Sequence, residues 1–365
     1  MIEFMHALDL AEKYFTQLVQ PLLEKNFPGL LYSAGLIGYG SEVLGFDTPM
    51  SMDHCWSPRM QVFLSAEQLD QAPLVNDLLR RQLPTHFLGF PLGVLPGEEG
   101  PDFFFMDDNP VAGEINHRVV ITSLREFILC EMNWDINEPL QPVDWLTISS
   151  QLLRVMTAGR VFYDNLGELT NIRQQLSYYP QDVWLYLLAC GWDRIGQEDH
   201  LMQRAGYAGD ELGSSVMGSR LVRDIMSLCF LMEKQYAPYP KWFGSAFNQL
   251  TCAEQFRPIL MQIQLAGSWQ ERARNLGVAS EMLAKKHNQL GITDPVPEVV
   301  SSFHGRPFQV INAENIRSLI LSMLTDPEVL RIANKGAVGG LDQFSDNTIL
   351  RSEPTWRQAL KGLFA

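Results

Sequence analysis

The sequence predicts an α+β protein, in which a mixed sheet with helices comes first and a mainly α-helical part follows. Two patterns along the 365 residues predict this order. Up to about residue 125, β-type segments alternate with helical ones between loops rich in Pro and Gly. After Pro139 and Pro142 the hydrophobic spacing is almost entirely helical. The composition is 46% hydrophobic and includes 20 Phe and 8 Trp, which is typical of a well-packed globular protein.

The N-terminal part begins with an amphipathic helix over 3–26. Its apolar residues recur at helical spacing until Pro28 ends the pattern. The elements that follow are recognised by β-branched residues, by alternation of apolar and polar residues, or by apolar residues at helical spacing. In order, we expect a buried strand, a second strand, a helix and two short strands, at 30–39, 59–65, 66–83, 103–106 and 117–122.

Helical periodicity dominates from Trp145 to Leu290. The helix over 210–236 is the clearest, because Asp210 and Glu211 suit a helix N-terminus and a broad apolar face follows them. The helices expected in this part are 145–158, 165–177, 181–203, 210–236, 241–250, 254–266 and 268–290.

These changes of pattern predict three parts of the chain. We expect a sheet-bearing domain over 1–140, a helical domain over 141–292 and a C-terminal helical extension over 293–365 that packs on the rest. In the extension, a Pro-rich break is followed by a strand pair near 303–311 and by two or three short helices.

Charge and cysteine usage limit the classes of partner. The formal net charge is −14, so the chain repels polyphosphate backbones, and a small molecule suits it better than a large nucleic acid. No apolar run reaches the length that spans a bilayer, and the acidic, amphipathic N-terminus is unlike a secretory signal, so we expect a cytoplasmic protein without a membrane partner. Five scattered cysteines with no CxxC pair argue against disulfides and structural zinc. No feature indicates an oligomeric state.

The segment Leu36 to Arg59 carries the first candidate site. Here an apolar run ends in Gly40-Ser41, and Asp53-His54 follows in the same stretch. A Gly-Ser turn between a strand and a helix leaves backbone N–H groups free to bind phosphate, and Gly lets the main chain approach the ligand closely. Asp53, with Asp47 as a second acid, is the expected Mg²⁺ ligand, because magnesium prefers carboxylate oxygens. Alternatively, the segment is an ordinary turn followed by a solvated loop.

Two further acids would complete such a metal site. A second carboxylate is expected two residues after Asp53, where the chain has Cys55, a soft ligand that magnesium does not favour. A third is expected on a later strand, but 117–122 has none, so Asp107 or Glu114 would have to substitute from a loop. Arg59 is a candidate contact for phosphate, or else a structural ion pair.

The segment from Gly40 to Arg59 and several later segments resemble a known family. GSEVLGFDTPMSMDHCWSPR is similar to the signature of a bacterial family of unknown function within the nucleotidyltransferase-fold superfamily, and so are later segments at 178–198, 206–247 and 285–292. The resemblance implies a nucleotidyltransferase-like domain followed by a helical domain. It also implies that Gly40, Ser41 and Asp53 contact the phosphates and the metal of a nucleotide.

A second set of candidates lies between 204 and 247. Arg220 and Arg223 share a helix face, and the rigid corner Tyr-Ala-Pro-Tyr-Pro-Lys-Trp shows aromatic rings beside Lys241. Such a corner can stack a base while Lys241 contacts phosphate. The alternative is that the rings fill gaps between helices and that Arg220 pairs with a nearby acid.

The leading hypothesis is therefore a nucleotidyltransferase-like protein that binds ATP or another nucleoside triphosphate with Mg²⁺ and moves a nucleotidyl group onto a small acceptor. The alternative is a degenerate member that keeps the fold as a nucleotide-binding or regulatory module, and the missing carboxylates favour it. Whether the chain is an enzyme stays open at this stage. Hydrolase, P-loop and Rossmann motifs are absent from the sequence.

Overall fold

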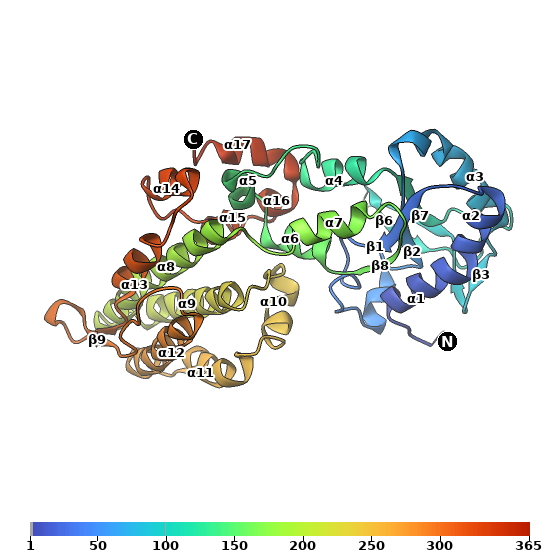
Figure 1. The fold of residues 1–365 in the computed structure, drawn as a ribbon. Helices are drawn as coiled ribbons and strands as arrows, with labels where there is room; N and C mark the ends of the chain where they lie inside the picture. The colour runs from blue at the N-terminus through green and yellow to red at the C-terminus, as the bar shows by residue number, and fades with distance from the viewer. Residues whose placement is uncertain (1–2, 99) are drawn as a thin grey trace. The chain divides into compact units, whose positions relative to one another are not determined.

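The computed structural model describes residues 3–98 and 100–365 (Figure 1). The chain forms two compact units, each made from two stretches of sequence. Unit 1 comprises 1–139 and 152–177, and unit 2 comprises 140–151 and 178–365. The expected division into 1–140, 141–292 and 293–365 differs from these units in two ways: 152–177 belongs with the N-terminal stretch, and the C-terminal residues belong with the helices.

Unit 1 is built on a four-stranded mixed sheet. Its strands lie in the order β7-β2-β1-β8. β1 pairs antiparallel with both β2 and β8, whereas β2 pairs parallel with β7. The bounds are Tyr32–Leu36 for β1, Arg59–Leu64 for β2, Arg118–Thr122 for β7 and Arg160–Asp164 for β8. The predicted α+β class with a mixed sheet is confirmed.

Strand β8 lies between the two helices expected over 145–158 and 165–177, in a gap where no strand was predicted. Gly159 has a φ of +71°, and a Cβ at this position would lie 2.0 Å from the Leu36 carbonyl oxygen. Only glycine lets the chain approach β1 this closely. The single helix expected over 145–158 is also broken, because Ile148 is extended between α5 (Pro142–Thr147) and α6 (Ser150–Thr157).

Helices from the start of the chain cover the sheet and close its core. The expected N-terminal helix is present as α1 (Ala7–Tyr14), a π-helical turn (Phe15–Val19) and α2 (Gln20–Asn26). Their apolar side chains pack with α3 (Ala72–Gln82) against β1 and β2 in one buried cluster. Burying each such side chain contributes roughly 1.5–3 kcal/mol.

The remaining elements of unit 1 surround the edge of the sheet. They are two 3-10 turns, two small hairpins and two helices: Pro49–Asp53, Ala66–Gln71, β3 (His86–Phe87) with β4 (Phe90–Pro91), β5 (Val94–Gly97) with β6 (Gly100–Met106), α4 (Leu124–Met132) and α7 (Glu168–Gln175). Ser123 caps α4 by accepting a hydrogen bond from the Glu126 N–H, which fixes the start of that helix beside β7.

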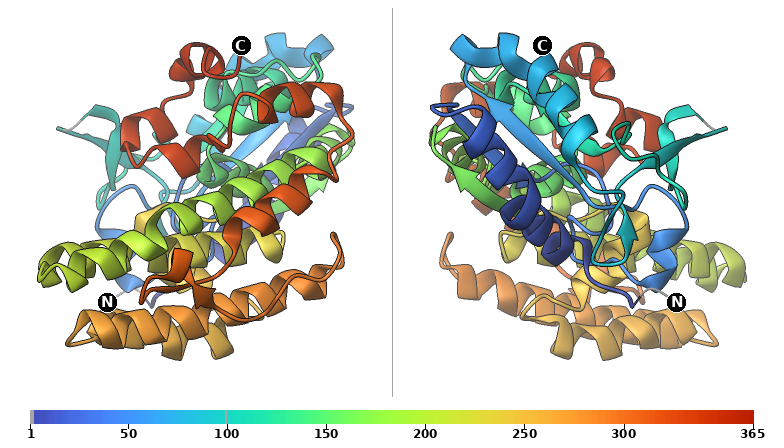
Figure 2. Two further views of the ribbon diagram at one scale, coloured as in Figure 1. Left: turned by 90° about the vertical axis from the view of Figure 1, so that its left-hand side faces the viewer. Right: turned by 90° about the vertical axis from the view of Figure 1, so that its right-hand side faces the viewer.

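Unit 2 is helical, as predicted for most of its length. Its longest helix, α8 (Gln181–Tyr207), packs against α9 (Glu211–Met232), and α13 (Ala313–Leu321) lies along α8 (Figure 2). The other elements are α10 (Pro240–Phe247), α11 (Ala253–Leu265), α12 (Trp269–Leu290), the hairpin β9 (Ser301–Ser302) with β10 (Gln309–Val310), α14 (Pro327–Ala333), α15 (Leu341–Phe344), α16 (Thr348–Ser352) and α17 (Arg357–Lys361). Over the described ranges, no helix combines the length and apolar character needed to cross a bilayer.

Candidate functional site

A tight turn follows β1 at Gly38 and Gly40. Both glycines have positive φ angles, +87° and +124°. A Cβ at Gly40 would lie 2.5 Å from Glu42 Oε1, so the turn requires glycine there for backbone conformation and for space. The carbonyl of Ser41 then accepts a hydrogen bond from the Phe46 N–H at 2.8 Å, which closes the loop. The predicted Gly-Ser turn is therefore present as a constrained bend at the end of a buried strand.

Arg59 lies at the start of β2 and joins this bend through Glu42. Its Nε and Nη2 donate to Glu42 Oε1 at 2.9 and 2.7 Å, and Nη2 also donates to the Tyr39 carbonyl. Its guanidinium stacks over the Tyr39 ring at 4.4 Å. Burial alone would lower the pKa of Arg59, but Glu42 raises it, so the guanidinium stays protonated. Arg59 and Glu42 thus form a buried, neutral pair that fixes the bend.

Arg118 lies beside Arg59, since the two residues are register partners on the parallel strands β2 and β7. Its Nη2 donates to the Tyr39 hydroxyl, and its guanidinium lies 3.6 Å above the Phe104 ring. Its Nε is buried without a hydrogen-bond partner in the described chain, and no Asp or Glu of that chain forms an ion pair with it. Burial lowers the pKa of Arg118 and so does the neighbouring Arg59, yet a guanidinium remains charged.

A cavity of about 710 Å³ opens over this arginine pair, and all of its lining belongs to unit 1. Tyr39, Arg59 and Arg118 contribute to one side of it, and α4 contributes Glu126 and Glu131. Glu126 is committed to capping α4, and it accepts a hydrogen bond from the Thr122 hydroxyl at 2.9 Å. The cavity therefore contains one cation, Arg118, that no carboxylate of the described chain neutralises.

Cys55 stands near the same arginine. It is close enough to Arg118 to influence the pKa of that guanidinium, and its backbone N–H donates to the Phe104 carbonyl at 2.8 Å. Its φ of +55° is unusual for a non-glycine residue. Residue 55, where a second metal-binding carboxylate was expected, thus lies near the Arg118 guanidinium and is a cysteine.

Asp47 is buried and its carboxylate holds the start of α1. Oδ2 accepts from the Ala7 N–H at 2.8 Å and from Trp56 Nε1 at 3.2 Å, and Oδ1 lies 2.9 Å from His6 Nδ1. An acid at a helix N-terminus is favoured by the exposed N–H groups and the helix dipole. All three partners belong to the protein itself, so the Asp47 carboxylate has a structural role: it holds the start of α1 and the Trp56 side chain.

Asp53 lies at the exposed end of the 3-10 turn Pro49–Asp53. Its Oδ1 is 2.9 Å from both the backbone N–H and the Nδ1 of His54. Of the loop acids, Asp107 accepts a hydrogen bond from the Asn109 N–H at 2.9 Å, and Glu114 is exposed. Within 3–98 and 100–365, no group of three or more His, Cys, Asp or Glu side chains is arranged to hold a metal ion. These donors do not fit an octahedral Mg²⁺ site.

Two of the cations predicted in the helical part, Arg220 and Lys241, lie in unit 2. Arg220 is half-exposed on α9 and forms an ion pair with Glu198 at 2.5 Å. Lys241 is exposed in the first turn of α10, and its Nζ lies 5.1 Å from the centre of the Trp242 ring. Gly40, Ser41 and Arg59 thus lie together in unit 1, whereas Arg220 and Lys241 belong to the other unit.

Sequence reasoning missed Tyr39, Glu42 and Arg118. Glu42 had a detectable signal, because a carboxylate between Ser41 and the apolar Val43-Leu44 needs a buried partner. Arg118 had a weaker one, as a charged residue at the second position of the predicted strand 117–122. Only the parallel pairing of β2 with β7 brings it beside Arg59.

Comparisons with known protein families give a match to part of the chain. Residues 145–243 match the sequence profile of a domain of unknown function, DUF4037. The predicted resemblance to a family of unknown function is confirmed over this segment, which runs from α5 into α10. No curated protein is similar to the chain.

Among the solved structures that are similar to the chain, one matches it over most of its length. It is described as a nucleotidyltransferase-like protein from Exiguobacterium sibiricum, with 8% sequence identity and a TM-score of 0.32, and the match covers 77% of this chain and 78% of that one. A match at this level carries no argument about the fold or the ligand of the present protein.

Proposed function

We propose that unit 1 binds a nucleoside phosphate, such as ATP or ADP, with the phosphate at Arg118, and that it acts as a nucleotide-binding module without metal-dependent transfer. The single observation that carries the proposal is the half-buried Arg118, a cation with an unpartnered Nε and no carboxylate partner in the described chain. A buried charge without a counter-ion is costly, so an anionic ligand stabilises it.

The surroundings of Arg118 support a phosphate rather than a carboxylate side chain of another protein. Its guanidinium offers a fork of donors, which matches phosphate oxygens. Tyr39, which accepts from Arg118, lines the same cavity and directly precedes the Gly40-Ser41 bend. Arg59 does not compete for the ligand, since Glu42 already neutralises it.

The nucleoside part of the proposal rests on the aromatic surface beside the cavity. Tyr39 is 42% exposed, so its ring presents a face to solvent beside the cavity. A base stacked on an aromatic ring gains roughly 1–3 kcal/mol. A nucleoside phosphate therefore offers both groups that this side of the cavity can bind.

The donor set argues against a resident metal. Asp47 already accepts from α1 and Trp56, Asp53 is paired with His54, and position 55 is a cysteine. Binding through Arg118 requires no metal, so chelation is expected to leave the affinity unchanged. This property separates the module from a two-metal transferase.

Calorimetric titration with ADP, ATP and adenosine, in Mg²⁺ and in EDTA, tests the proposal. We expect ADP and ATP to bind with or without Mg²⁺ and adenosine to bind much more weakly. Arg118→Gln should weaken ADP binding roughly tenfold to hundredfold, because it removes charge-assisted hydrogen bonds. The control is Arg81→Gln, which removes an exposed ion pair with Asp77 on α3 and should leave the affinity unchanged.

Two results would contradict the proposal. If Arg118→Gln binds ADP as tightly as the wild type does, the nucleotide binds at a site that does not include Arg118. Pyrophosphate release from ATP that requires Mg²⁺ and is lost in Asp53→Asn would instead establish the rival hypothesis, nucleotidyl transfer to a small acceptor.

A further inference from the structure

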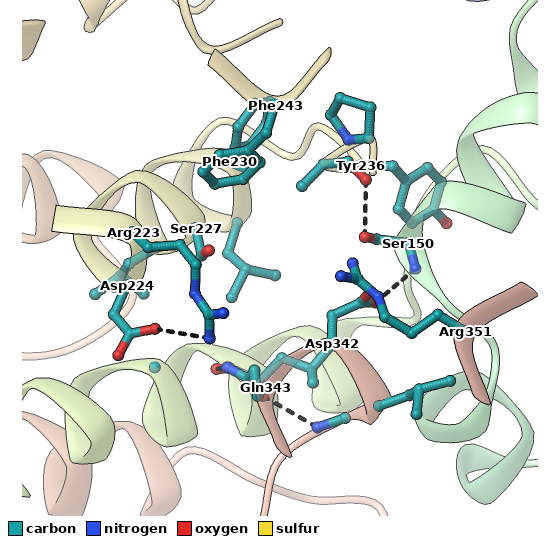
Figure 3. Close-up of a pocket in the computed structure, with 18 of the residues that line it drawn as sticks. Ser150, Arg223, Asp224, Ser227, Phe230, Tyr236, Phe243, Asp342, Gln343 and Arg351 are labelled. Carbon is teal, nitrogen blue, oxygen red and sulfur yellow. Dashed lines mark hydrogen bonds and ion pairs between the residues drawn. The ribbon is translucent and has the colours of Figure 1, made fainter. Parts of the chain in front are cut away.

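Unit 2 contains a cavity of its own, with a volume of about 360 Å³ (Figure 3). Three regions far apart in sequence build it: the stretch around α5, the helices α8 and α9 with the start of α10, and the C-terminal helices α15 and α16. This volume is within the range of small-molecule sites and accommodates a bicyclic ring. The proposed nucleotide site does not involve any of these residues.

Aromatic side chains form one wall of this cavity. The rings of Phe230 and Phe243 lie 5.4 Å apart at 37°, and those of Tyr179 and Tyr236 lie 5.0 Å apart at 82°. Burial raises the pKa of both tyrosines above the ordinary value, so their hydroxyl groups stay neutral at physiological pH. The wall therefore offers flat, uncharged surfaces to a planar ligand.

The charged side chains around the cavity cancel one another. Three arginines and three aspartates line it, and each arginine has an aspartate partner: Arg194 with Asp224, Arg223 with Asp346, and Arg351 with Asp342. The lining is therefore electrically neutral in sum. A charged ligand would lose its hydration here without a net opposite charge to replace it.

One side chain of the lining, Arg351, carries a hydrogen-bond donor without a partner among the described residues. Arg351 points into the cavity from α16, opposite Arg223 (Figure 3). Its Nη2 pairs with Asp342, whose other oxygen accepts from the Ser150 N–H at 2.6 Å. Its Nε is buried and has no partner among the described residues. An unsatisfied buried donor costs about 1–3 kcal/mol, which a ligand oxygen can recover.

We propose that this cavity binds an uncharged, planar ring compound that carries a carbonyl oxygen. The ring lies against Phe230, Phe243 and the two tyrosines, and the carbonyl accepts a hydrogen bond from Arg351 Nε. The neutral sum of the lining selects against acids and amines, while the aromatic wall selects for flat rings.

Three naphthalene derivatives of nearly equal size test the ligand class. In titrations monitored by ligand-observed NMR, 2-naphthamide should bind, and 2-naphthoate and 2-naphthylmethylamine should bind at least about tenfold more weakly. Ser227→Phe places a ring inside the cavity and should abolish binding of the amide. The Ser227 side chain makes no hydrogen bond with the described residues, so the substitution removes none.

Arg351→Lys tests the hydrogen bond itself. Lysine keeps a cation for Asp342 but has no Nε donor, so the affinity for 2-naphthamide should fall roughly tenfold. The matched control is Arg331→Lys on α14, an exposed partner of Glu328 outside the cavity, which should bind the amide as the wild type does.

The proposal is overturned if 2-naphthamide does not bind, if the acid or the amine binds as tightly, or if Ser227→Phe binds like the wild type. Should Arg351→Lys fail to fold, which circular dichroism would reveal, the ratio of amide to acid affinity and the Ser227→Phe result still decide. Arg118→Gln should leave amide binding unchanged, so the failure of one proposal does not imply the failure of the other.

Discussion

Two carboxylates in one loop, Asp47 and Asp53, occupy opposite environments. The Asp47 side chain is 1% exposed and accepts from α1 and from Trp56, whereas the Asp53 side chain is 59% exposed and contacts its neighbour His54. When a buried carboxylate loses its charge, every hydrogen bond that it accepts becomes weaker. At an exposed carboxylate, water replaces the lost interactions. The same chemical group therefore stabilises the fold at one position and is available to solvent at the other.

Asp47→Asn should lower the free energy of unfolding by roughly 1–3 kcal/mol, because a neutral amide cannot accept from the Ala7 N–H, His6 and Trp56 as a carboxylate does. Asp53→Asn, the matched control, should change it by less than about 0.5 kcal/mol. Urea unfolding followed by circular dichroism measures both. An Asp47→Asn protein as stable as the wild type would show that the carboxylate has no structural role.

At the scale of elements, Glu233 ties together the ends of three helices of unit 2. It follows the last residue of α9 and accepts from the N–H groups of Thr251 and Cys252, which precede α11, at 2.7 and 2.8 Å. Lys286 of α12 donates to it at 2.8 Å. A negative charge is unfavourable at a helix C-terminus, so these partners offset the dipole and hold α9 against α11 and α12.

This cluster makes unit 2 sensitive to acid. Burial pushes the pKa of Glu233 up, but the hydrogen bonds from Lys286, Cys252 and the two backbone amides outweigh it and lower the pKa from 4.5 to about 2. Because the folded-state pKa is depressed, the stabilisation is fully present above pH 4.5 and is lost as the pH falls towards 2.

Glu233→Gln should therefore be less stable than the wild type at pH 7, by on the order of 2–3 kcal/mol. The difference between the two proteins should shrink as the pH falls from 4.5 to 2. Thermal unfolding at a series of pH values measures this. Glu254→Gln, an exposed position on α11, is the control. A difference that stays constant with pH would contradict the linkage.

At the scale of the whole molecule, unit 1 depends on a segment that returns to it late in the sequence. β8 pairs with β1, and the Gly38 and Gly159 N–H groups donate to the Val155 and Val43 carbonyls at 3.0 Å. The Phe162 ring packs on Phe15 at 5.8 Å, and Arg160 pairs with Asp9 and Glu12. The first 139 residues alone would leave β1 as an open edge strand.

A fragment of residues 1–177 should therefore unfold cooperatively in urea, whereas a fragment of residues 1–140 should not. The shorter fragment lacks β8, α7 and the aromatic packing on Phe15, so it exposes apolar surface and should bind a hydrophobic dye such as ANS. Cooperative unfolding of the shorter fragment would contradict the dependence on 152–177.

Local patterns predicted much of the fold. Apolar residues at helical spacing predicted the N-terminal helix and the long helices of unit 2 to within a few residues. Residue composition predicted β1, alternation predicted β2, and β7 was expected as a short strand between loops. These signals are local, because a helix or a strand must present one apolar face to whatever core forms. β8 escaped because Arg160–Asp164 is short, and its partner β1 lies more than a hundred residues earlier in the chain.

The candidate site was predicted in part for the same reason. The Gly40-Ser41 bend could be recognised from its own residues, since glycine there answers a local demand for a positive φ. The roles of Asp47, Arg59 and Arg118 could not, because each depends on which distant group the fold brings within hydrogen-bond distance: α1 for Asp47, Glu42 for Arg59, and no carboxylate of the described chain for Arg118.

The sequence by itself determined the α+β class, the order of the main elements and the position of the glycine bend. The tertiary structure decided which charges are neutralised and which remain available, in the arginine pair of unit 1 and in the cavity of unit 2. The physical reason is that periodicity and backbone conformation are properties of neighbouring residues, whereas the energy of a charge depends on the burial and the partners that only the folded chain provides.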